Sequence, residues 1–397
     1  MHKSEYKWLL RGFVILTGIL LVIGCKTSDI SKLQSEINMI ASKFVPDNRI
    51  GICNIKIKAS GKTLVLKGET TDEAAKKAII KALDNQIKTL IDSIVILPDT
   101  IRSKNYMGLV TLSVINLRKE PDHAAELVSQ ARLGTPVVIL KEHNSWLQIK
   151  TPDNYISWTE KSSIVLVDRN EMNLWKNAQK VIYLENTGWL YDTTGAKAGV
   201  TGDLVAGCIM DKSGEMKGYV KVTLPDGRNG FIEKQKVMDY NIWKNSIKCT
   251  AENVCKVART FLGLPYLWGG SSTKGVDCSG FVQSVYFLNG LILQRDASLQ
   301  ALHGTPVDIS SGYHDLKSGD LLFFGSKENG KNHVTHVALY LGNNDYINSS
   351  GRVMINSLDS TKINYVSYRI SSLLTAKRII GTEGDSGIVH VNKHPWY

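Results

Sequence analysis

The sequence lacks three patterns that would assign it to common functional classes. Its six cysteines form no CxxC pair and have no histidine partners at the spacing of a zinc site, so we expect neither a metal nor a cofactor. The formal net charge is +11, but the lysines are scattered and no basic patch is interleaved with aromatic residues, which argues against nucleic-acid binding. No apolar run approaches the roughly 20 residues that a membrane-spanning helix needs.

What is present is the composition of a globular chain with several domains. Hydrophobic residues make up 43% and charged residues 21% of the 397 residues, which argues against extended disorder. A chain of this length should hold two to four domains. The local patterns described below predict an α+β multidomain protein.

Residues 1–25 resemble a bacterial lipoprotein signal peptide. Basic residues precede an apolar core from Gly12 to Gly24, which is shorter than a membrane-spanning helix. The core ends in a lipobox-like Val-Ile-Gly-Cys, in which the small Gly24 precedes Cys25. We expect Cys25 to carry a lipid and to anchor the chain in the bacterial cell envelope, on the periplasmic side or at the outer membrane. A simple membrane anchor, with a cysteine there by chance, is the alternative.

Residues 29–98 predict a small α+β module with the element order αββαβ. Apolar residues have helical spacing from Ile30 to Ile40, and two short alternating strands follow. A second helix, capped at Thr71-Asp72, is expected to run to about Leu90 before a last strand. The order resembles a BON-type module of envelope proteins, and a spacer is the simpler interpretation.

Residues 103–168 and 178–240 look like two copies of one small β unit. In each copy an alternating strand meets a Pro-Asp turn, at Pro152 and at Pro225, and returns through an aromatic strand. The pattern resembles bacterial SH3 modules, which predicts two small β-barrels. Because each copy is short, we expect it to pack against a neighbouring domain.

Cys278 is the candidate nucleophile. It follows Gly275-Val276-Asp277 and precedes a helical apolar pattern that begins at Phe281, so we expect it in the first turn of a helix. Backbone N–H groups and the helix dipole at that position favour the thiolate and can hold an oxyanion. A buried structural cysteine is the alternative, because inert buried cysteines are common.

Two further residues could complete a catalytic arrangement. His336 begins a predicted strand over residues 336–342, and Asn348 lies in the strand that follows a tight turn. In such a hairpin Asn348 can lie beside His336 on one face. A cysteine at a helix N-terminus, a histidine and a polar orienting residue form a nucleophile, base and orienter.

Four sequence blocks together resemble the NlpC/P60 cysteine peptidases: residues 266–270 (Tyr-Leu-Trp-Gly-Gly), 277–281 (Asp-Cys-Ser-Gly-Phe), 319–321 (Gly-Asp-Leu) and 336–340 (His-Val-Ala-Leu-Tyr). The resemblance implies a papain-like fold for residues 248–381 and cleavage of peptidoglycan stem peptides. It makes Cys278 the nucleophile and His336 the general base. The third polar residue of the family is most often a second histidine, so Asn348 is a departure, although an asparagine can also hold an imidazole.

The resemblance also implies a substrate pocket. Members with two SH3 modules include γ-D-glutamyl-L-diamino acid peptidases of the dipeptidyl-peptidase VI type, in which an acidic residue and a tyrosine of the first module close the groove. Glu120 and Tyr155 match those positions, and a carboxylate there would pair with a free α-amino group. A turn carboxylate and a core aromatic are the alternative interpretations of these two residues. The other matching positions are Tyr266, Trp268, Asp277, Ser279, Arg295, Asp296 and Ser298.

We therefore expect an envelope lipoprotein that hydrolyses the bond between γ-D-Glu and a diamino acid, diaminopimelate or lysine, in released muropeptides with a free N-terminal L-Ala. An endopeptidase that remodels intact peptidoglycan is one alternative, and a non-catalytic envelope scaffold is another. We expect peptide ligands, membrane contact through the lipid alone, and a monomer. Residues 382–397 are interpreted as an extension without an assigned function.

Overall fold

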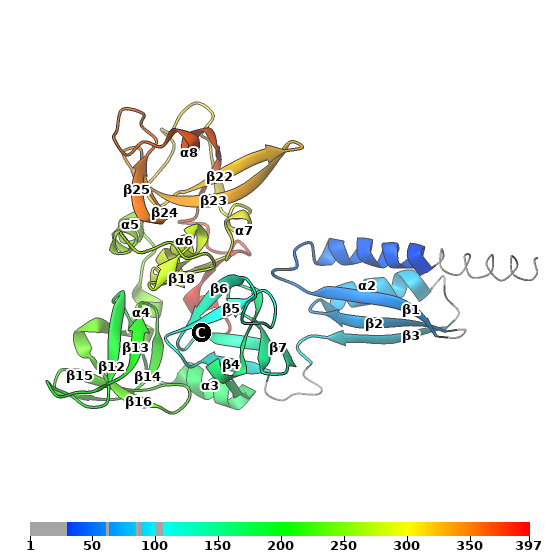
Figure 1. Cartoon of the computed structure of the whole chain (residues 1–397), viewed down its shortest axis with the longest axis horizontal. Helices are drawn as coiled ribbons and strands as arrows, with labels where there is room; N and C mark the ends of the chain where they lie inside the picture. The colour runs from blue at the N-terminus through cyan, green and yellow to red at the C-terminus, as the bar shows by residue number, and fades with distance from the viewer. Residues whose placement is uncertain (1–29, 61–62, 85–86, 88, 100–105) are drawn as a thin grey trace, which may run out of the picture. The chain divides into compact units, whose positions relative to one another are not determined.

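The computed structural model describes residues 30–60, 63–84, 87, 89–99 and 106–397 (Figure 1). The chain divides into two compact units, Met1–Asp99 and Thr100–Tyr397, which are described separately. Cys25 and the predicted signal peptide lie outside the described residues. Within the described ranges, no helix is long and apolar enough to cross a membrane.

The first unit has the predicted order αββαβ. Residues 30–44 are helical, and β1 pairs antiparallel with β2, which pairs parallel with β3 across the α2 connection. Asp72 caps α2 by accepting from the Ala75 N–H at 2.8 Å. The predicted extension of this helix to Leu90 is wrong, because Leu90 already begins β3. The strands and the second helix are β1 Cys53–Ser60, β2 Thr63–Thr70, α2 Glu73–Asp84 and β3 Leu90–Ile96.

The second unit begins with two seven-stranded sheets that share one strand order. The first sheet runs β10-β4-β7-β8-β9-β5-β6, and the second, read from its other edge, runs β17-β11-β14-β15-β16-β12-β13. Each strand therefore has its counterpart seven numbers later, so the two predicted copies share one topology. The first sheet comprises β4 Met107–Val110, β5 Val114–Arg118, β6 Leu127–Arg132, β7 Pro136–His143, β8 Trp146–Lys150, β9 Ile156–Glu160 and β10 Ile164–Val167. The second comprises β11 Lys180–Tyr183, β12 Thr187–Tyr191, β13 Val200–Val205, β14 Ile209–Met216, β15 Tyr219–Thr223, β16 Asn229–Glu233 and β17 Val237–Asp239.

Local sequence explains the turns and linking helices of these two sheets. The predicted Pro-Asp turn between β8 and β9 contains Asn154 at φ 66°, a left-handed conformation that asparagine tolerates. The helix α3, Arg169–Asn177, links the two sheets and begins with a capping box between Asp168 and Glu171. The helix α4, Tyr240–Ser246, leads from the second sheet into the C-terminal domain.

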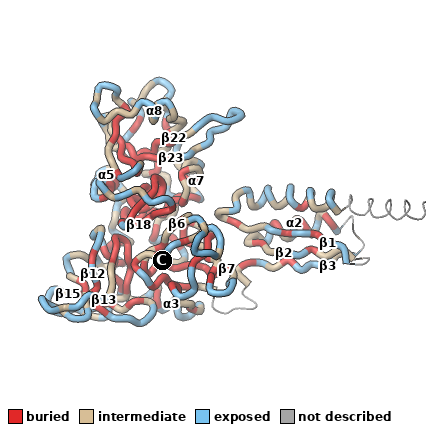
Figure 2. The backbone as a smooth tube through the Cα atoms, in the orientation of Figure 1, coloured by how far each residue is buried: buried red, intermediate tan, exposed pale blue. Residues whose placement is uncertain are grey.

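The C-terminal domain packs one buried helix, α6 (Cys278–Leu288), against a six-stranded sheet of order β21-β26-β22-β23-β24-β25. Phe281, Val282 and Val285 of α6 share a fully buried core with Val337 and Leu339 of the sheet. In Figure 2 the middle of this domain, around the labels β22, β23 and β18, is coloured as buried, whereas the far end of the β22–β23 hairpin is exposed. The sheet strands are β21 Thr305–Val307, β22 Leu321–Glu328, β23 Lys331–Gly342, β24 Asp345–Ser350, β25 Arg352–Ser357 and β26 Leu373–Arg378. The remaining elements are α5 Ala251–Thr260, β18 Ser271–Ser272, β19 Gly275–Val276, β20 Leu291–Leu293, α7 Ala297–Gln300, α8 Ser367–Ser371 and β27 Ile388–His390.

The last residues are part of the packed structure rather than a loose extension. The strand β27 pairs antiparallel with β20. Tyr397 is buried and contacts the ring of Phe287, with ring centroids 6.2 Å apart. The His394 ring lies in hydrogen-bond distance, 3.1 Å, of the Pro152 carbonyl. The tail thus connects α6 to the first SH3-type sheet, which the sequence did not indicate because all its partners are distant along the chain.

Candidate active site

Cys278 is the first residue of α6, as the sequence predicts. Asp277 caps the helix by accepting from the Gly280 N–H at 2.7 Å. Gly280 has no room for a side chain, since a Cβ there would lie 2.0 Å from the Gly270 carbonyl oxygen. This close contact fixes the Gly269-Gly270 loop against the start of α6. It explains why a glycine stands two residues after the cysteine.

The hairpin β23–β24 brings His336 and Asn348 together. Its turn residues Asn343 and Asn344 have φ values of 53° and 64°, the left-handed pair that a tight two-residue hairpin requires. The His336 Nε2 atom lies 3.0 Å from the Asn348 Oδ1 atom. Because Oδ1 accepts, Nε2 carries the hydrogen and Nδ1 is left as the basic nitrogen.

A further asparagine holds this arrangement. The Asn348 amide donates to the Asn356 Oδ1 at 2.9 Å and to the Met354 carbonyl at 3.4 Å. The Asn356 amide in turn donates to the Asn364 carbonyl at 3.3 Å. These bonds fix which end of the Asn348 amide faces the imidazole. The sequence analysis missed Asn356. The register of the β24–β25 hairpin, which places Asn356 on the strand next to Asn348, could have indicated it.

The thiol and the imidazole are both buried, and burial sets their charge state. Burial and the Asp277 charge raise the pKa of Cys278 to about 11, against the N–H groups of Val337 and Ser279, which lower it. Burial and the Arg369 charge lower the pKa of His336 to about 3, while the hydrogen bond that His336 donates to Asn348 raises it. These two pKa values favour a neutral thiol and a neutral imidazole, whereas the helix N-terminus alone would favour the thiolate.

Asp277 and Arg295 form a buried ion pair beside the cysteine. The Arg295 Nη2 atom lies 2.6 Å from the Asp277 Oδ2 atom, and Nη1 donates to Oδ1 at 3.1 Å. Arg295 Nη1 also donates to the Ser279 hydroxyl at 3.0 Å, and Nε donates to the Ser129 hydroxyl of β6 at 3.0 Å. Burial lowers the pKa of Arg295, but the charge and hydrogen bond of Asp277, together with the Asp296 and Tyr155 charges, outweigh it and raise the pKa overall. The structure thus brings Asp277, Ser279 and Arg295 together and ties them to the first SH3-type sheet.

The remaining predicted pocket residues are placed around this pair. Burial and the neighbouring Cys278 raise the pKa of Tyr266 to about 12. Asp296 is the N-cap residue of α7 and Ser298 lies in its first turn, both half-buried. Tyr155 is buried and follows the turn whose Asp153 accepts from Gln283 of α6 at 2.7 Å.

Glu120 is exposed in the segment between β5 and β6. Glu126, six residues later in the same segment, contacts Trp268 of the Tyr266–Gly270 loop. Its Oε1 atom accepts from the Trp268 indole N–H at 2.9 Å, and Trp268 is itself 62% exposed. Sequence reasoning missed Glu126 because its partner is 142 residues away, and the signal that could have found it is an exposed indole that needs an acceptor.

Sequence comparison with known proteins identifies two of the domains. The NlpC/P60 family model matches residues 263–371, and the bacterial SH3 domain model matches residues 113–165. The curated protein "Dipeptidyl-peptidase 6" of Lysinibacillus sphaericus is 32% identical over 265 residues, which are 64% of this chain and 92% of that protein.

The chain belongs to the NlpC/P60 family.

Two further similarities extend this result. "Gamma-D-glutamyl-L-lysine dipeptidyl-peptidase" of Bacillus subtilis (strain 168) is 31% identical over 229 residues, covering 56% of this chain and 71% of that protein. The crystal structure of an NlpC/P60 family protein from Bacillus cereus ATCC 10987 covers 69% of this chain and 99% of that chain, with a TM-score of 0.59 and 23% identity, and so shows the shared fold. The family assignment made from the four sequence blocks, with its SH3-type modules and cysteine peptidase class, is confirmed.

The described cysteines and carboxylates offer no metal site. No group of three or more His, Cys, Asp or Glu side chains in the described ranges could hold a metal ion. Cys249 and Cys255, which could have formed a bridge, are both free thiols. Cys208 is buried, and burial raises its pKa to about 11.

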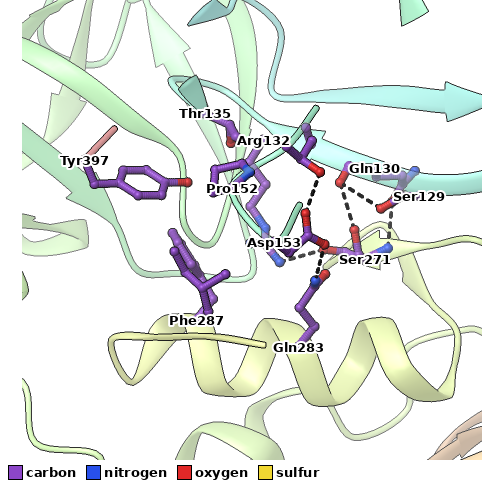
Figure 3. A pocket seen from close by; sticks show the side chains of 13 residues that line it. Ser129, Gln130, Arg132, Thr135, Pro152, Asp153, Ser271, Gln283, Phe287 and Tyr397 are labelled. Carbon is purple, nitrogen blue, oxygen red and sulfur yellow. Dashed lines mark hydrogen bonds between the residues drawn. The ribbon is translucent and has the colours of Figure 1, made fainter. Parts of the chain in front are cut away.

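A cavity of about 60 Å³ lies where the first SH3-type sheet meets α6 and Tyr397 (Figure 3). Arg132 crosses it and donates through Nη2 to the Ser271 carbonyl and the Ser284 hydroxyl, both at 2.6 Å. Neither Cys278 nor His336 lines this cavity. It therefore belongs to the junction between the domains and not to the catalytic groove.

Proposed function

We propose that this chain is a cysteine peptidase that cleaves the bond between γ-D-Glu and the diamino acid in released peptidoglycan peptides with a free N-terminal L-Ala. The observation that supports it is the contact of the first SH3-type module with the residues around the catalytic cysteine. Glu126 of this module accepts from Trp268, and the Asp277–Arg295 pair bonds to Ser129 of the same module. We take this side as the amine end of the groove. A groove that ends at a carboxylate suits a short peptide with a free amine.

The catalytic residues act in a fixed order in this proposal. The pKa values of Cys278 and His336 favour a neutral thiol and a neutral imidazole. The Nδ1 atom of His336 therefore takes the thiol proton as the sulfur of Cys278 attacks the γ-carbonyl. The Cys278 N–H at the start of α6 and a neighbouring donor hold the oxyanion. The imidazolium then protonates the leaving amine as the C–N bond breaks, and Asn348 keeps the ring oriented through Nε2. A water molecule, deprotonated by the same imidazole, then hydrolyses the thioester, which releases L-Ala-D-Glu and restores the thiol.

Several finer assignments belong to the same proposal. The catalytic roles of Cys278, His336 and Asn348, the binding roles of the pocket residues, and lipidation of Cys25 remain to be tested by mutation. A Cys25→Ala variant should lose incorporation of labelled fatty acid and leave the membrane fraction. The first unit, with its BON-like element order, would then serve as a spacer between the lipid and a monomeric enzyme.

The test uses the chain without residues 1–25, with L-Ala-γ-D-Glu-diamino acid tripeptides as substrates and Cys278→Ala as the control. Mass spectrometry should show release of L-Ala-D-Glu by the parent protein alone. Cleavage of intact sacculi at a similar rate would favour an endopeptidase that remodels the wall. A folded protein that cleaves neither substrate would contradict the proposal and favour a scaffold.

A further inference from the structure

Arg369 of α8 lies on the imidazole side of the catalytic site. Its guanidinium carbon is 5.6 Å from the centroid of the Phe324 ring, and that ring is 5.7 Å from the His336 ring. Nη2 donates to the Ser350 hydroxyl at 3.4 Å and to the Tyr368 hydroxyl at 3.2 Å. The half-buried guanidinium is therefore held in place by neutral groups, and it shares the Phe324 ring as a neighbour with the His336 imidazole.

Arg369 differs from the other arginines of this domain that are held in place. Arg295 pairs with Asp277 at 2.6 Å and Arg378 pairs with Asp320 at 2.8 Å. No carboxylate of the described residues lies within ion-pair distance of Arg369. The Arg369 charge nevertheless acts on His336, whose pKa it lowers as the second largest cause after burial. A fixed cation without a counter-ion next to a catalytic base destabilises the protonated base, so a compensating function is expected.

The position of Arg369 relative to the amine end of the groove defines which part of a substrate it meets. Figure 1 shows α8 at the end of the C-terminal domain away from β5 and β6, with α6 between them. A peptide with its amine at Glu126 and its γ-carbonyl at Cys278 must extend its leaving group toward His336, because the imidazole protonates the leaving amine. The leaving diamino acid therefore comes to lie on the Arg369 side.

We propose that Arg369 forms a subsite for a carboxylate carried by the leaving diamino acid. This inference rests on the proposed function. A tripeptide carries the α-carboxylate of its last residue, and diaminopimelate carries a second carboxylate at the end of its side chain. A lysine side chain ends in an ammonium group, which Arg369 repels. A guanidinium can bind either carboxylate in a bidentate manner. If Arg369 binds the side-chain carboxylate, the subsite favours diaminopimelate over lysine.

Four peptides separate the two carboxylates. They are the L-Ala-γ-D-Glu tripeptides of L-Lys and of meso-diaminopimelate, each with a free or an amidated α-carboxyl group. In the parent protein kcat/KM is measured for all four and compared with Arg369→Gln, Arg369→Lys and Arg369→Glu. A charged hydrogen bond of this kind is worth about a tenfold change in kcat/KM at a half-exposed position. The charge-matched control is Arg259→Gln, which removes an exposed cation of α5.

The expected result is selective. Arg369→Gln should lower kcat/KM about tenfold for every peptide with a leaving-group carboxylate and by less than about twofold for the amidated lysine peptide. Arg369→Lys should restore part of the loss, and Arg369→Glu should deepen it. A loss confined to the diaminopimelate peptides assigns the side-chain carboxylate, and a loss confined to the free α-carboxyl peptides assigns the other. An equal loss on all four peptides would show a merely structural role and overturn the proposal, as would no loss on any.

A second readout works without turnover. Calorimetric binding of the four peptides to Cys278→Ala, with and without Arg369→Gln, should show the same dependence in Kd. If the parent protein cleaves none of the peptides, the proposed function fails, and the carboxylate subsite is still judged by this binding series. Carboxylate-independent binding in that series would overturn the subsite.

Discussion

The buried pair of Asp277 and Arg295 gives the sharpest stability prediction. Replacing Arg295 with Met keeps the volume of the side chain close to that of the original but removes the guanidinium. The Asp277 carboxylate, whose side chain is only 11% exposed, then lacks its cation at 2.6 Å. Removal of one partner from a buried ion pair destabilises a protein by about 3–5 kcal/mol.

The remaining contacts of Asp277 place the effect at the lower end of that range. Its carboxylate still accepts from the Gly269 N–H at 3.0 Å and from the Gly280 N–H at 2.7 Å. The Ser129 and Ser279 hydroxyls each lose a donor that the guanidinium supplied. We therefore expect Arg295→Met to lower the free energy of unfolding by about 3 kcal/mol, and to lower activity because the Arg295 charge lowers the pKa of Cys278.

The assay is urea unfolding of the chain without residues 1–25, followed by tryptophan fluorescence and circular dichroism. The double variant Arg295→Met with Asp277→Asn should recover part of the loss, because it removes the uncompensated charge. A loss below about 1 kcal/mol in the single variant would show that the pair does not carry the expected energy. Additive losses in the double variant would equally refute the reasoning.

Three other predictions follow from the site. Since the pKa of Cys278 is about 11, its alkylation rate by iodoacetamide, resolved by mass spectrometry, should keep rising with pH to about 10; a plateau below pH 7 would reveal a preformed thiolate. Asn348→Ala should lower kcat roughly 100-fold by freeing the imidazole, whereas Asn348→His should retain most activity; equal activity of Asn348→Ala and the parent protein would exclude an orienting role. Glu126→Gln should raise KM for free-amine peptides about tenfold and Glu120→Gln should not, with the reverse order pointing back to the sequence-based choice.

Much of the catalytic domain could be predicted from sequence because its determinants are local. The helix start at Cys278 follows from Asp277 and the apolar pattern behind it. The contact between His336 and Asn348 follows from a hairpin whose Asn343-Asn344 turn fixes the pairing. The repeated strand order of the two SH3-type sheets follows from the repeated Pro-Asp turns.

The features that the sequence did not reveal depend on contacts between distant segments. Glu126 contacts Trp268 only because the first SH3-type module packs beside the catalytic domain. The raised pKa of the thiol comes from burial, which the motif around Cys278 does not encode. The packing of Tyr397 on Phe287 depends on two domains that close around the end of the chain.

The central claim is that the groove selects peptides with a free amino terminus. The most direct test is the ratio of kcat/KM for L-Ala-γ-D-Glu-diamino acid tripeptide over its N-acetylated form, measured for the parent protein and for Glu126→Gln. The account predicts a ratio of roughly ten or more for the parent protein, since a charge-assisted hydrogen bond to the exposed Glu126 is lost, and a clearly smaller ratio for Glu126→Gln. A ratio near one in the parent protein would contradict it and identify a wall-remodelling endopeptidase.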